Sequence, residues 1–466
     1  MKKRVAFHTL GCKVNQYETE AMEELFLREG YCLADENQAA DVVVINTCTV
    51  THTSDAKSRQ QVRKMKRENP NAVIAVVGCY AQVAAKTLSA LPEVDIVLGT
   101  KGRQRLPALV DEVWRTGKQQ IAVEDLDAVT DFDALTIETE QSTTRATVKI
   151  QEGCDMFCSY CIIPYARGHI ASRPLSSIVK EAEALAARGF QELVLTGIHV
   201  ASYGKDARFR TETSGMELTD VIEAVAAIPE IRRIRLSSIE PRWVTPEKLE
   251  RLAATGKLCP HFHLSLQSGS DRILEKMNRH YTTAVYAEKV DAIRRVFPNA
   301  GLTTDVIVGF PEEGEKEFQD TLAFTRQIGF SRMHIFPYSP RQGTPAALFT
   351  GQVDAAIKKE RAARLAEQEV IMRHAFMDRM IGKTLSVLTE EKRDEKGRIS
   401  GYSGNYLRVA LPASTEAQER REEGVVLDTG GIDVPSPEVN HIYSVRVLKR
   451  DGEELVGITT GEEKNA

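Results

Sequence analysis

The segment RATVKIQEGCDMFCSYCIIPYARG, residues 145–168, joins a strand-like run to three closely spaced cysteines, Cys154, Cys158 and Cys161. Three thiolates can hold three irons of a cubane [4Fe–4S] cluster, and the fourth iron then lacks a protein ligand and can chelate a substrate or cofactor. An electron-transfer cluster normally takes four cysteines. A zinc site that lacks one ligand, or unrelated buried cysteines, is the alternative. The C-x3-C-x2-C spacing at a strand end favours the cluster.

The same segment opens a region, residues 145–370, in which strand-like and helix-like runs alternate. The predicted strands are 146–151, 192–197, 233–238, 262–267, 303–310 and 332–338. The predicted helices are 178–188, 218–227, 246–254, 271–276 with 285–296, and 315–327. A βα array of this length predicts a barrel, and six units make it a partial (β/α)6 barrel rather than the eight-stranded form.

The preceding region, residues 1–125, also alternates between short β-branched runs and helical patterns. Its predicted strands are 4–10, 41–47, 72–78 and 96–100. This alternation predicts an α/β fold with a doubly wound parallel sheet. Residues 123–144 are acidic and weakly periodic, so we interpret them as a linker that could carry an edge strand.

The last region, residues 375–466, does not continue the alternation of strands and helices. Short strand signals, TLSVLTEE, ISGYSGNYLRVAL, GVVLDT and YSVRVLKRDGEELVGITT, are separated by Gly, Asn and Asp turns. They predict a small all-β barrel or sandwich. A charged amphipathic helix over 355–380 is expected to connect this region to the preceding one.

Composition narrows the class of protein. A chain of 466 residues exceeds what one hydrophobic core usually serves, so two or three domains are expected. The net charge of −5 gives no general attraction to nucleic acid, so any polyanion site requires a local basic surface. No apolar run reaches the roughly 20 residues that a bilayer span needs, and no signal-peptide pattern is present. We therefore expect a cytoplasmic protein with no membrane partner.

A cytoplasmic setting disfavours disulfides, so the eight cysteines indicate metal binding or catalysis. Cys12, Cys48 and Cys79 each lie one or two residues past a predicted strand of the first region. Ligands of doubly wound sheets bind outside the carboxyl ends of the strands. The three thiols should therefore meet at one edge and could hold a second cubane cluster with an open iron; a chance coincidence is the alternative. We interpret Cys32 and Cys259 as structural.

The strings TLGCKVNQYETE, VINTCTV, VVGCYAQ, EGCDMFCSYCIIPYARG and SRP together resemble the radical S-adenosylmethionine (SAM) methylthiotransferases. The resemblance implies two [4Fe–4S] clusters: an auxiliary one on Cys12, Cys48 and Cys79, and one on the central cysteines that binds SAM. Reduction of that SAM would yield a 5′-deoxyadenosyl radical. The last region would be a TRAM-type barrel that binds RNA.

The resemblance also places the SAM contacts at the carboxyl ends of the barrel strands, where barrel active sites lie. The candidates are Gly197, Ser238, Glu240, Gln267, Ser268 and Gly309. Many radical SAM enzymes have Gly-Gly-Glu after the second strand, where this chain has Thr-Gly-Ile at 196–198, so the group that meets the SAM ammonium is open. Strand-end packing is an equally good explanation for each candidate. Tyr160 could shield the cluster, pack near adenine or simply belong to the core.

RNA contact needs local cations and stacking surfaces, although a basic run is often only a solvated face. Three groups of residues offer these features. They are the helical run Arg63, Lys64, Lys66 and Arg67; the pair Arg167 and Arg173 beside the cysteine loop; and Tyr402, Asn405, Tyr406 and Arg408 in the last region.

Within the family, the strings are most similar to the branch that acts on N6-threonylcarbamoyladenosine at position 37 of tRNA. The implied reaction replaces hydrogen at C2 of the modified adenine by a methylthio group. The implied partners are the tRNA anticodon stem-loop and a reducing electron donor such as flavodoxin, and we expect a monomer. The alternatives are the isopentenyladenosine branch, the branch that modifies a ribosomal-protein aspartate, and a non-catalytic iron–sulfur regulator that binds RNA.

Overall fold

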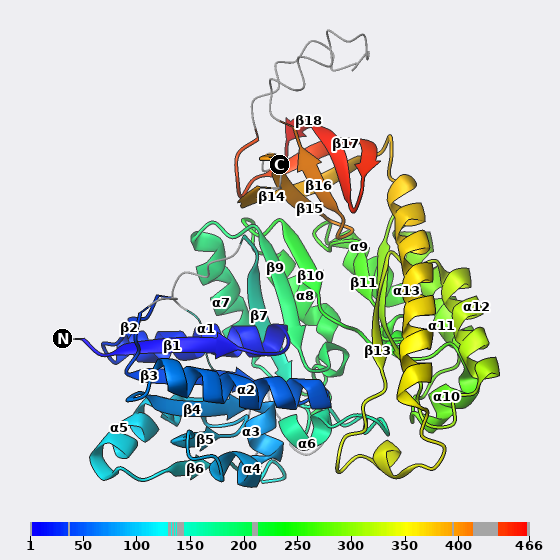
Figure 1. Cartoon of the computed structure of the whole chain (residues 1–466). Helices are drawn as coiled ribbons and strands as arrows, with labels where there is room; N and C mark the ends of the chain where they lie inside the picture. Colours follow the sequence, from blue (N-terminus) through cyan, green and yellow to red (C-terminus); the bar gives the residue numbers. More distant parts are fainter. Residues whose placement is uncertain are drawn as a thin grey trace.

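The structure is a computed structural model that describes residues 2–35, 38–128, 132, 135, 137, 144–206, 213–393, 396–412 and 437–463. Figure 1 shows three parts in chain order: an α/β layer at the amino terminus, a central strand–helix array, and a small β-barrel at the far end of a long helix. Within the described residues, no helix combines the length and apolarity that crossing a bilayer requires.

The first part contains a six-stranded sheet in which every neighbouring pair is parallel. The strand order is β2-β1-β3-β4-β5-β6. The strands are β1 Arg4–Thr9, β2 Cys32–Leu33, β3 Val42–Thr47, β4 Val73–Gly78, β5 Ile96–Leu98 and β6 Gln120–Ala122. The four predicted strands are present. The edge strands β2 and β6 were not predicted, because two or three residues are too few to show a periodic pattern.

Helices cover both faces of this sheet, as a doubly wound fold requires. They are α1 Lys13–Arg28, α2 His52–Glu68, α3 Cys79–Val83, α4 Ala85–Ser89 and α5 Leu106–Thr116, with a 3₁₀ turn at Arg103–Arg105. Successive residues of β3 face opposite sides: Val44 packs in the cluster that contains Phe26 of α1, and Val43 packs in the cluster that contains Val62 of α2. Burial on both faces explains why the central strands are continuous apolar runs.

The six predicted strands of the central region are also present. They are β7 Ala146–Glu152, β9 Glu192–Gly197, β10 Arg233–Leu236, β11 His261–His263, β12 Gly301–Val308 and β13 Arg332–Pro337. Two sheets, β10-β9-β7-β8 and β11-β12-β13, are joined by the parallel bridges Ile234↔Leu258 and Ile239↔Leu264. The short antiparallel strand β8, Ala171–Ser172, pairs with the other side of β7. The array is therefore a partial barrel that stays open between β7 and β13.

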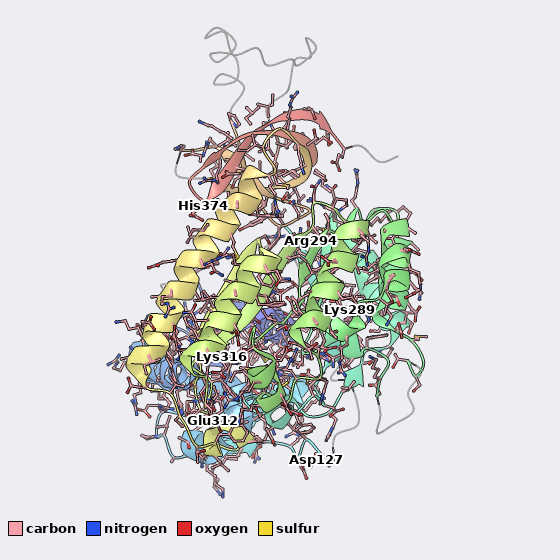
Figure 2. The ribbon with its side chains drawn as sticks, turned by 90° about the vertical axis from the view of Figure 1, so that its right-hand side faces the viewer. Asp127, Lys289, Arg294, Glu312, Lys316 and His374 are labelled. Carbon is pink, nitrogen blue, oxygen red and sulfur yellow. The ribbon has the colours of Figure 1, made fainter. Side chains whose placement is uncertain are left out.

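Helices surround the outside of this barrel. They are α6 Ile163–Arg167, α7 Leu175–Ala187, α8 Leu218–Ala226, α9 Pro246–Ala254, α10 Asp271–Lys276, α11 Thr283–Val296, α12 Glu315–Ile328 and α13 Ala355–Asp378, with 3₁₀ turns at Val200–Ser202, Pro241–Trp243 and Pro345–Leu348. Figure 2 shows α11, α12 and α13 side by side, with Lys289, Lys316 and His374 on this outer layer. The predicted connector is α13, which runs along the barrel to the last part (Figure 1).

The last part is a closed barrel with the strand order β14-β15-β16-β18-β17. Its strands are β14 Thr384–Arg393, β15 Ile399–Ser403, β16 Arg408–Leu411, β17 Ile442–Asp451 and β18 Glu454–Glu462. Val387, Val409 and Val445 are fully buried in its core, and each such side chain contributes about 1.5–3 kcal/mol relative to an exposed one. The predicted strand GVVLDT lies outside the described residues. Because the barrel is closed, none of its five described strands has an unpaired edge.

The turn between β15 and β16 closes the amino-terminal end of the central barrel. The Arg235 guanidinium of β10 donates to the carbonyls of Gly404 and Ser403 at 3.0 and 3.2 Å. The ring of Tyr406 lies 4.7 Å from that of His261, and Asn405 is 3% exposed. The expectation that Asn405 and Tyr406 form a surface for RNA is therefore wrong, because these side chains pack toward the central barrel. Tyr402 stacks on Tyr406 at 5.0 Å and keeps part of its surface accessible, so its role stays a prediction. The sequence could not show this contact because it joins residues far apart in the chain.

We expect Arg235→Met to lower the free energy of unfolding by about 3 kcal/mol, because the buried carboxylate of Glu192 loses its partner at 2.7 Å and keeps only the more distant Arg233 at 3.4 Å. Arg251→Met is the matched control: Arg251 is exposed, pairs with Asp220 and Glu223, and should cost less than about 1 kcal/mol. Differential scanning calorimetry under anaerobic conditions compares the two, and equal shifts would contradict the expectation.

Candidate functional site

The central cysteine loop begins directly after β7. Gly153 has a φ of +70°, and a Cβ there would lie 1.8 Å from the His169 carbonyl oxygen, so only glycine fits. The Cys154 amide donates to the Gly168 carbonyl at 3.0 Å, and the Cys161 amide donates to that of Cys158 at 2.9 Å. These bonds fold the loop back on itself and gather the three thiols at the carboxyl end of the barrel.

The carboxyl-terminal end of α10 supports the loop. The Ser159 hydroxyl donates to the carbonyl of Lys276 at 2.7 Å, and the Ser159 amide donates to that of Met277 at 3.0 Å. The Arg279 guanidinium lies 3.4 Å from the Cys158 sulfur and also donates to the Tyr281 hydroxyl. Sequence reasoning missed Arg279, because its separation from Cys158 leaves no local signal.

The three thiols form a donor set that fits an iron–sulfur cluster. Burial, together with the charges of the neighbouring thiols, raises the pKa of Cys154 to about 11 and that of Cys161 to about 12. Thiolates crowded in this way need positive charge close by, which irons would supply. Three sulfurs leave one iron of a cubane without a protein ligand.

The predicted SAM contacts have different neighbours in the structure. Gln267 lines a cavity of about 240 Å³ together with Tyr160 and Cys161. The Ser268 hydroxyl instead faces Thr321 of α12 at 3.4 Å, and Gly309 lies beneath the Lys358 side chain of α13. Gly197 packs against Gln151, the buried Glu240 pairs with Arg242 at 3.0 Å, and Ser238 is exposed. A role for any of these residues in SAM binding stays a prediction.

The cavity beside Gln267 lies between the central cysteines and the first part of the chain. Its walls include Val50 and Thr51, which follow Cys48, and Phe336 and Tyr338 from the end of β13. Val50 is 53% exposed and Phe336 is 44% exposed, so two large apolar side chains face open space there. The space therefore touches Cys161 of the central set and the residues that follow Cys48, and it has apolar walls.

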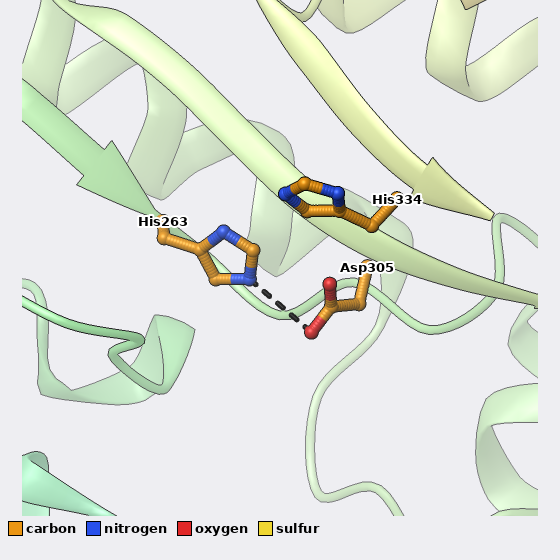
Figure 3. Close-up of side chains that lie close together, drawn as sticks. All are labelled: His263, Asp305 and His334. Atoms are coloured by element: carbon orange, nitrogen blue, oxygen red, sulfur yellow. Dashed lines mark ion pairs between the residues drawn. The ribbon is translucent and has the colours of Figure 1, made fainter. Parts of the chain in front are cut away.

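Three neighbouring strands give the barrel interior a polar wall (Figure 3). His263 of β11, Asp305 of β12 and His334 of β13 bring their ligand atoms within 4.8 Å of one another. His263 Nε2 lies 3.3 Å from Asp305, and its Nδ1 lies 3.0 Å from the Thr303 hydroxyl. Sequence reasoning missed this group, although the three residues lie on adjacent predicted strands and Asp305 and His334 are paired in register.

The second cysteine set also converges. Cys12 is the N-cap of α1, Cys48 follows β3, and Cys79 begins α3. β1, β3 and β4 are adjacent parallel strands, and a Cβ on Gly11 would lie 2.9 Å from the Cys48 Cβ. Burial raises the pKa of Cys79 to about 12, and the thiols of Cys12 and Cys48 add to the shift. The strand-end argument therefore places the thiols at one edge, and their role as iron ligands stays a prediction.

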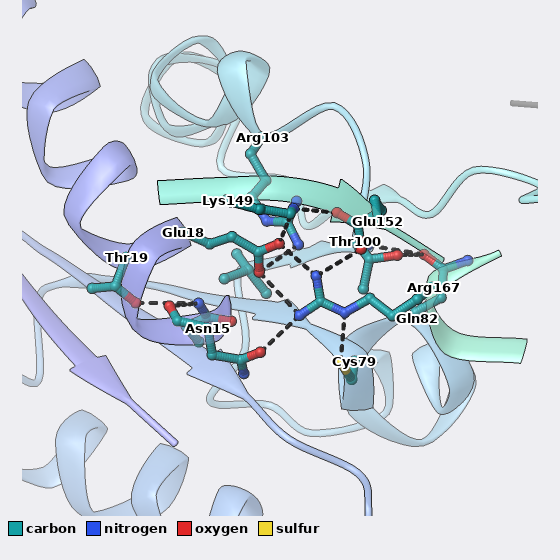
Figure 4. A network of polar contacts seen from close by, with 12 residues as sticks. Asn15, Glu18, Thr19, Cys79, Gln82, Thr100, Arg103, Lys149, Glu152 and Arg167 are labelled. Carbon is teal, nitrogen blue, oxygen red and sulfur yellow. Dashed lines mark hydrogen bonds and ion pairs between the residues drawn. The ribbon is translucent and has the colours of Figure 1, made fainter. Parts of the chain in front are cut away.

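A buried network of charges joins this set to the central loop (Figure 4). Arg167, at the end of α6, donates to the Cys79 sulfur at 3.0 Å and to the Asn15 side chain at 2.7 Å. It also binds both carboxylates of the network, Glu18 of α1 and Glu152 of β7. Lys149 and Arg103 pair with Glu18 at 2.7 and 2.9 Å. Three cations and two carboxylates thus tie α1 to β7 and α6.

A second arginine makes a similar link next to Cys48. The Arg341 guanidinium, from the loop after β13, donates to the Thr49 hydroxyl at 2.7 Å and to Asp55 of α2 at 2.6 Å. The side chains of Arg341 and Asp55 are both almost completely buried. Cys79 and Cys48 of the first sheet therefore each have an arginine of the central part nearby.

Two of the proposed RNA contacts are corrected by these results. Arg167 and Arg173 are both 0% exposed, so the expectation that they meet RNA phosphates is wrong; Arg173 pairs with the buried Glu181. Arg63, Lys64 and Arg67 of α2 are exposed, whereas Lys66 donates to the Ala72 carbonyl. Arg408 pairs with Glu454 at 2.6 Å. Of the basic groups named from the sequence, α2 is the one that still presents exposed cations, of which Lys64 pairs with Glu68 at 3.8 Å.

We expect Glu18→Gln to destabilise the protein in a pH-dependent way. Burial alone would raise the pKa of Glu18, but Arg103, Arg167 and Lys149 outweigh it and lower the pKa from 4.5 to about 2. Such a group stabilises the fold above its unfolded pKa, and this contribution is lost as the pH falls through the folded pKa. At pH 7 the substitution should therefore cost about 3 kcal/mol, and the difference should vanish between about pH 5 and pH 2.

Urea unfolding of the metal-free protein, followed by circular dichroism across this pH range, measures the difference. Glu20→Gln on the same helix is the control, because Glu20 binds only Gln16 and should show no comparable loss. A Glu18→Gln deficit that does not change with pH would contradict the expectation.

Two family models match the chain: "Uncharacterized protein family UPF0004" over residues 4–99 and "Radical SAM superfamily" over residues 148–325. The chain is 42% identical to the threonylcarbamoyladenosine tRNA methylthiotransferase MtaB of Bacillus subtilis, over 88% of this chain and 91% of that one. It is 38% identical to the tRNA-2-methylthio-N(6)-dimethylallyladenosine synthase of Moorella thermoacetica, over 88% and 93%.

A solved structure shares the fold at low identity. The radical SAM methyltransferase TsrM of Kitasatospora setae, whose structure contains cobalamin and a [4Fe-4S] cluster, superposes with a TM-score of 0.53 at 14% identity, over 75% of this chain and 77% of that one. Together with the relatives that match over most of their length, these findings show that the chain belongs to the radical SAM tRNA methylthiotransferases, a family that uses SAM and [4Fe–4S] clusters.

Proposed function

We propose that the protein adds a methylthio group to C2 of N6-threonylcarbamoyladenosine at position 37 of tRNA. The observation that carries this proposal is the cavity that Cys161 of the central set lines together with Val50 and Thr51, which follow Cys48 in the chain. The preference for the threonylcarbamoyl substrate is supported by the names of the relatives in Bacillus subtilis and Aquifex aeolicus, which are 42% and 41% identical to this chain.

In this proposal Cys154, Cys158 and Cys161 hold the cluster that binds SAM, and Cys12, Cys48 and Cys79 hold the auxiliary cluster. A [4Fe–4S] cluster with an open iron supplies the single electron that cleaves the sulfonium of SAM. The protein positions and shields this chemistry. Val50 and Phe336 give the cavity apolar walls. Arg279 and Arg167 place positive charge beside Cys158 and Cys79.

The remaining expectations belong to the same proposal. Residues 1–125 would carry the auxiliary cluster, residues 145–370 the SAM site, and residues 375–466 a TRAM-like surface that binds RNA. That surface would not include the side chains of the β15–β16 turn, because they pack against the central barrel. The anticodon stem-loop would enter the cavity, a donor such as flavodoxin would supply electrons, and the protein would act as a cytoplasmic monomer.

A second candidate is methylthiolation of N6-isopentenyladenosine at position 37. The relative from Moorella thermoacetica favours it, because that protein matches a similar share of this chain and is named for the dimethylallyl substrate. A non-catalytic regulator differs from both candidates, because it would produce no 5′-deoxyadenosine and no methionine from SAM.

The substrate prediction is tested by mass spectrometry of tRNA nucleosides. A strain that lacks this gene should lose 2-methylthio-threonylcarbamoyladenosine, and the plasmid-borne gene should restore it. Loss of the isopentenyl derivative instead would support the second candidate, and a modified ribosomal protein with unchanged tRNA would contradict both.

The two cysteine sets should have separate roles, since they lie on different sheets. We expect about eight irons in the reconstituted protein and about four in either triple Cys→Ala variant. The variant of Cys154, Cys158 and Cys161 should lose reductive SAM cleavage. The variant of Cys12, Cys48 and Cys79 should keep it while forming no methylthio product. Cys32→Ala is the control and should retain both activities; SAM cleavage by the first variant would contradict the assignment.

A further inference from the structure

Asp305 projects from β12 into the interior of the central barrel. Side chains alternate along a strand: Val306 packs in the hydrophobic core, whereas Asp305 lines the cavity beside Cys161. His334 of β13 is the register partner of Asp305, and His263 comes from β11 on the other side of β12. Three adjacent strands thus turn two imidazoles and one carboxylate toward one another (Figure 3).

The three side chains do not satisfy one another's hydrogen bonds. His263 Nε2 is buried and, among the residues that the structure describes, has no hydrogen-bond partner. An oxygen of Asp305 lies 3.3 Å from this nitrogen, but not in a hydrogen-bonding geometry. A buried polar atom without a partner costs about 1–3 kcal/mol. A cation bound between the nitrogen and the carboxylate would remove this cost.

The second ring nitrogen of His263 has a partner of the kind that metal ligands use. Nδ1 lies 3.0 Å from the Thr303 hydroxyl. A histidine that binds a metal ion donates its other ring N–H to a nearby oxygen, which fixes the ring and leaves one lone pair for the ion. With the Nδ1 proton on the Thr303 hydroxyl, Nε2 presents its lone pair to the Asp305 carboxylate. Two electron-rich groups then face each other, and a cation between them makes the contact attractive.

The separations fit a small transition-metal ion. Two ligands about 2.1 Å from one tetrahedral ion lie about 3.4 Å apart, which matches the 3.3 Å between His263 Nε2 and Asp305. The three ligand atoms all lie within 4.8 Å of one another, and His334 is exposed, so its ring has room to turn toward the other two. Imidazole ligands favour zinc and similar ions over magnesium and calcium, which prefer oxygen.

We propose that His263, Asp305 and His334 bind a divalent transition-metal ion of the zinc class inside the central barrel. The inference goes beyond the proposed function and does not depend on it, because the site uses none of the cysteines proposed as iron ligands. Three protein ligands leave the fourth position of a tetrahedral ion to a water molecule. Because Asp305 lines the cavity, the ion would stand in the wall of that cavity.

Zinc binding to the holoenzyme tests the proposal. Reconstituted protein is dialysed anaerobically against a series of zinc buffers around about 1 μM free Zn²⁺, and zinc and iron are then counted by mass spectrometry. We expect about one zinc per chain with the iron content unchanged. The zinc X-ray absorption spectrum should show nitrogen and oxygen neighbours at about 2.0–2.2 Å and no sulfur.

Substitutions locate the ion. Asp305→Asn and His334→Ala should each weaken zinc binding by about 100-fold or more, since removal of a partner of a ligand alone costs about 10- to 100-fold. His374→Ala is the matched control, because His374 lies on the outer layer and pairs with Glu453 (Figure 2); it should bind zinc like the unchanged protein. His334→Cys should retain zinc and add one sulfur neighbour at about 2.3 Å.

Four outcomes overturn the inference. Sulfur neighbours in the spectrum of the unchanged protein would place the zinc on cysteines. A protein that binds no zinc while its irons are intact would leave His263 and Asp305 as an ordinary ion pair. Zinc binding that Asp305→Asn and His334→Ala leave unchanged would put the ion elsewhere, and so would a His334→Cys variant whose zinc has no sulfur neighbour. If Asp305→Asn fails to fold, the two variants of the exposed His334 decide.

Discussion

The guanidinium of Arg167 is the group on which the arrangement of the two cysteine sets depends. It belongs to the loop that carries Cys154, Cys158 and Cys161, yet it donates to the sulfur of Cys79 and to Glu18 on the other sheet. Removing one partner of such a buried network leaves a desolvated charge, which costs about 3–5 kcal/mol. A fully matched network permits few alternative packings, so it holds the carboxyl ends of two unrelated sheets against each other.

The same network explains why a cavity forms between the carboxyl ends of the two sheets. Parallel strands end in loops at their carboxyl edges, and here two such edges share one cavity. Arg167 and Arg341 of the central part each bind residues of the first part. These two contacts fix the distance between the two cysteine sets. Val50 and Thr51 of the first part and Cys161 of the central part line this cavity, which neither part could form alone.

The small barrel at the carboxyl end is more than an appended module. Its β15–β16 turn places Tyr406 against His261 and gives Arg235 two carbonyl acceptors. The central barrel is thereby closed at its amino-terminal end, and substrate access is left to the carboxyl end. Polar groups that would otherwise be buried without partners are satisfied across this contact, which is the physical reason that the two parts sit in one orientation.

The sequence by itself determined the fold class, the six central strands and the positions of both cysteine sets. These features follow from local patterns: β-branched runs mark buried parallel strands, and Cys12, Cys48, Cys79 and the central triplet each follow a strand end. Only the tertiary structure decided which side chains surround the cysteines. Arg167 and Arg173 looked like free cations but are buried, and Tyr406 looked like an exposed aromatic but faces His261. The reason is physical: burial and ion pairing depend on contacts between residues far apart in the chain, such as Arg341 with Asp55, and no local pattern encodes them.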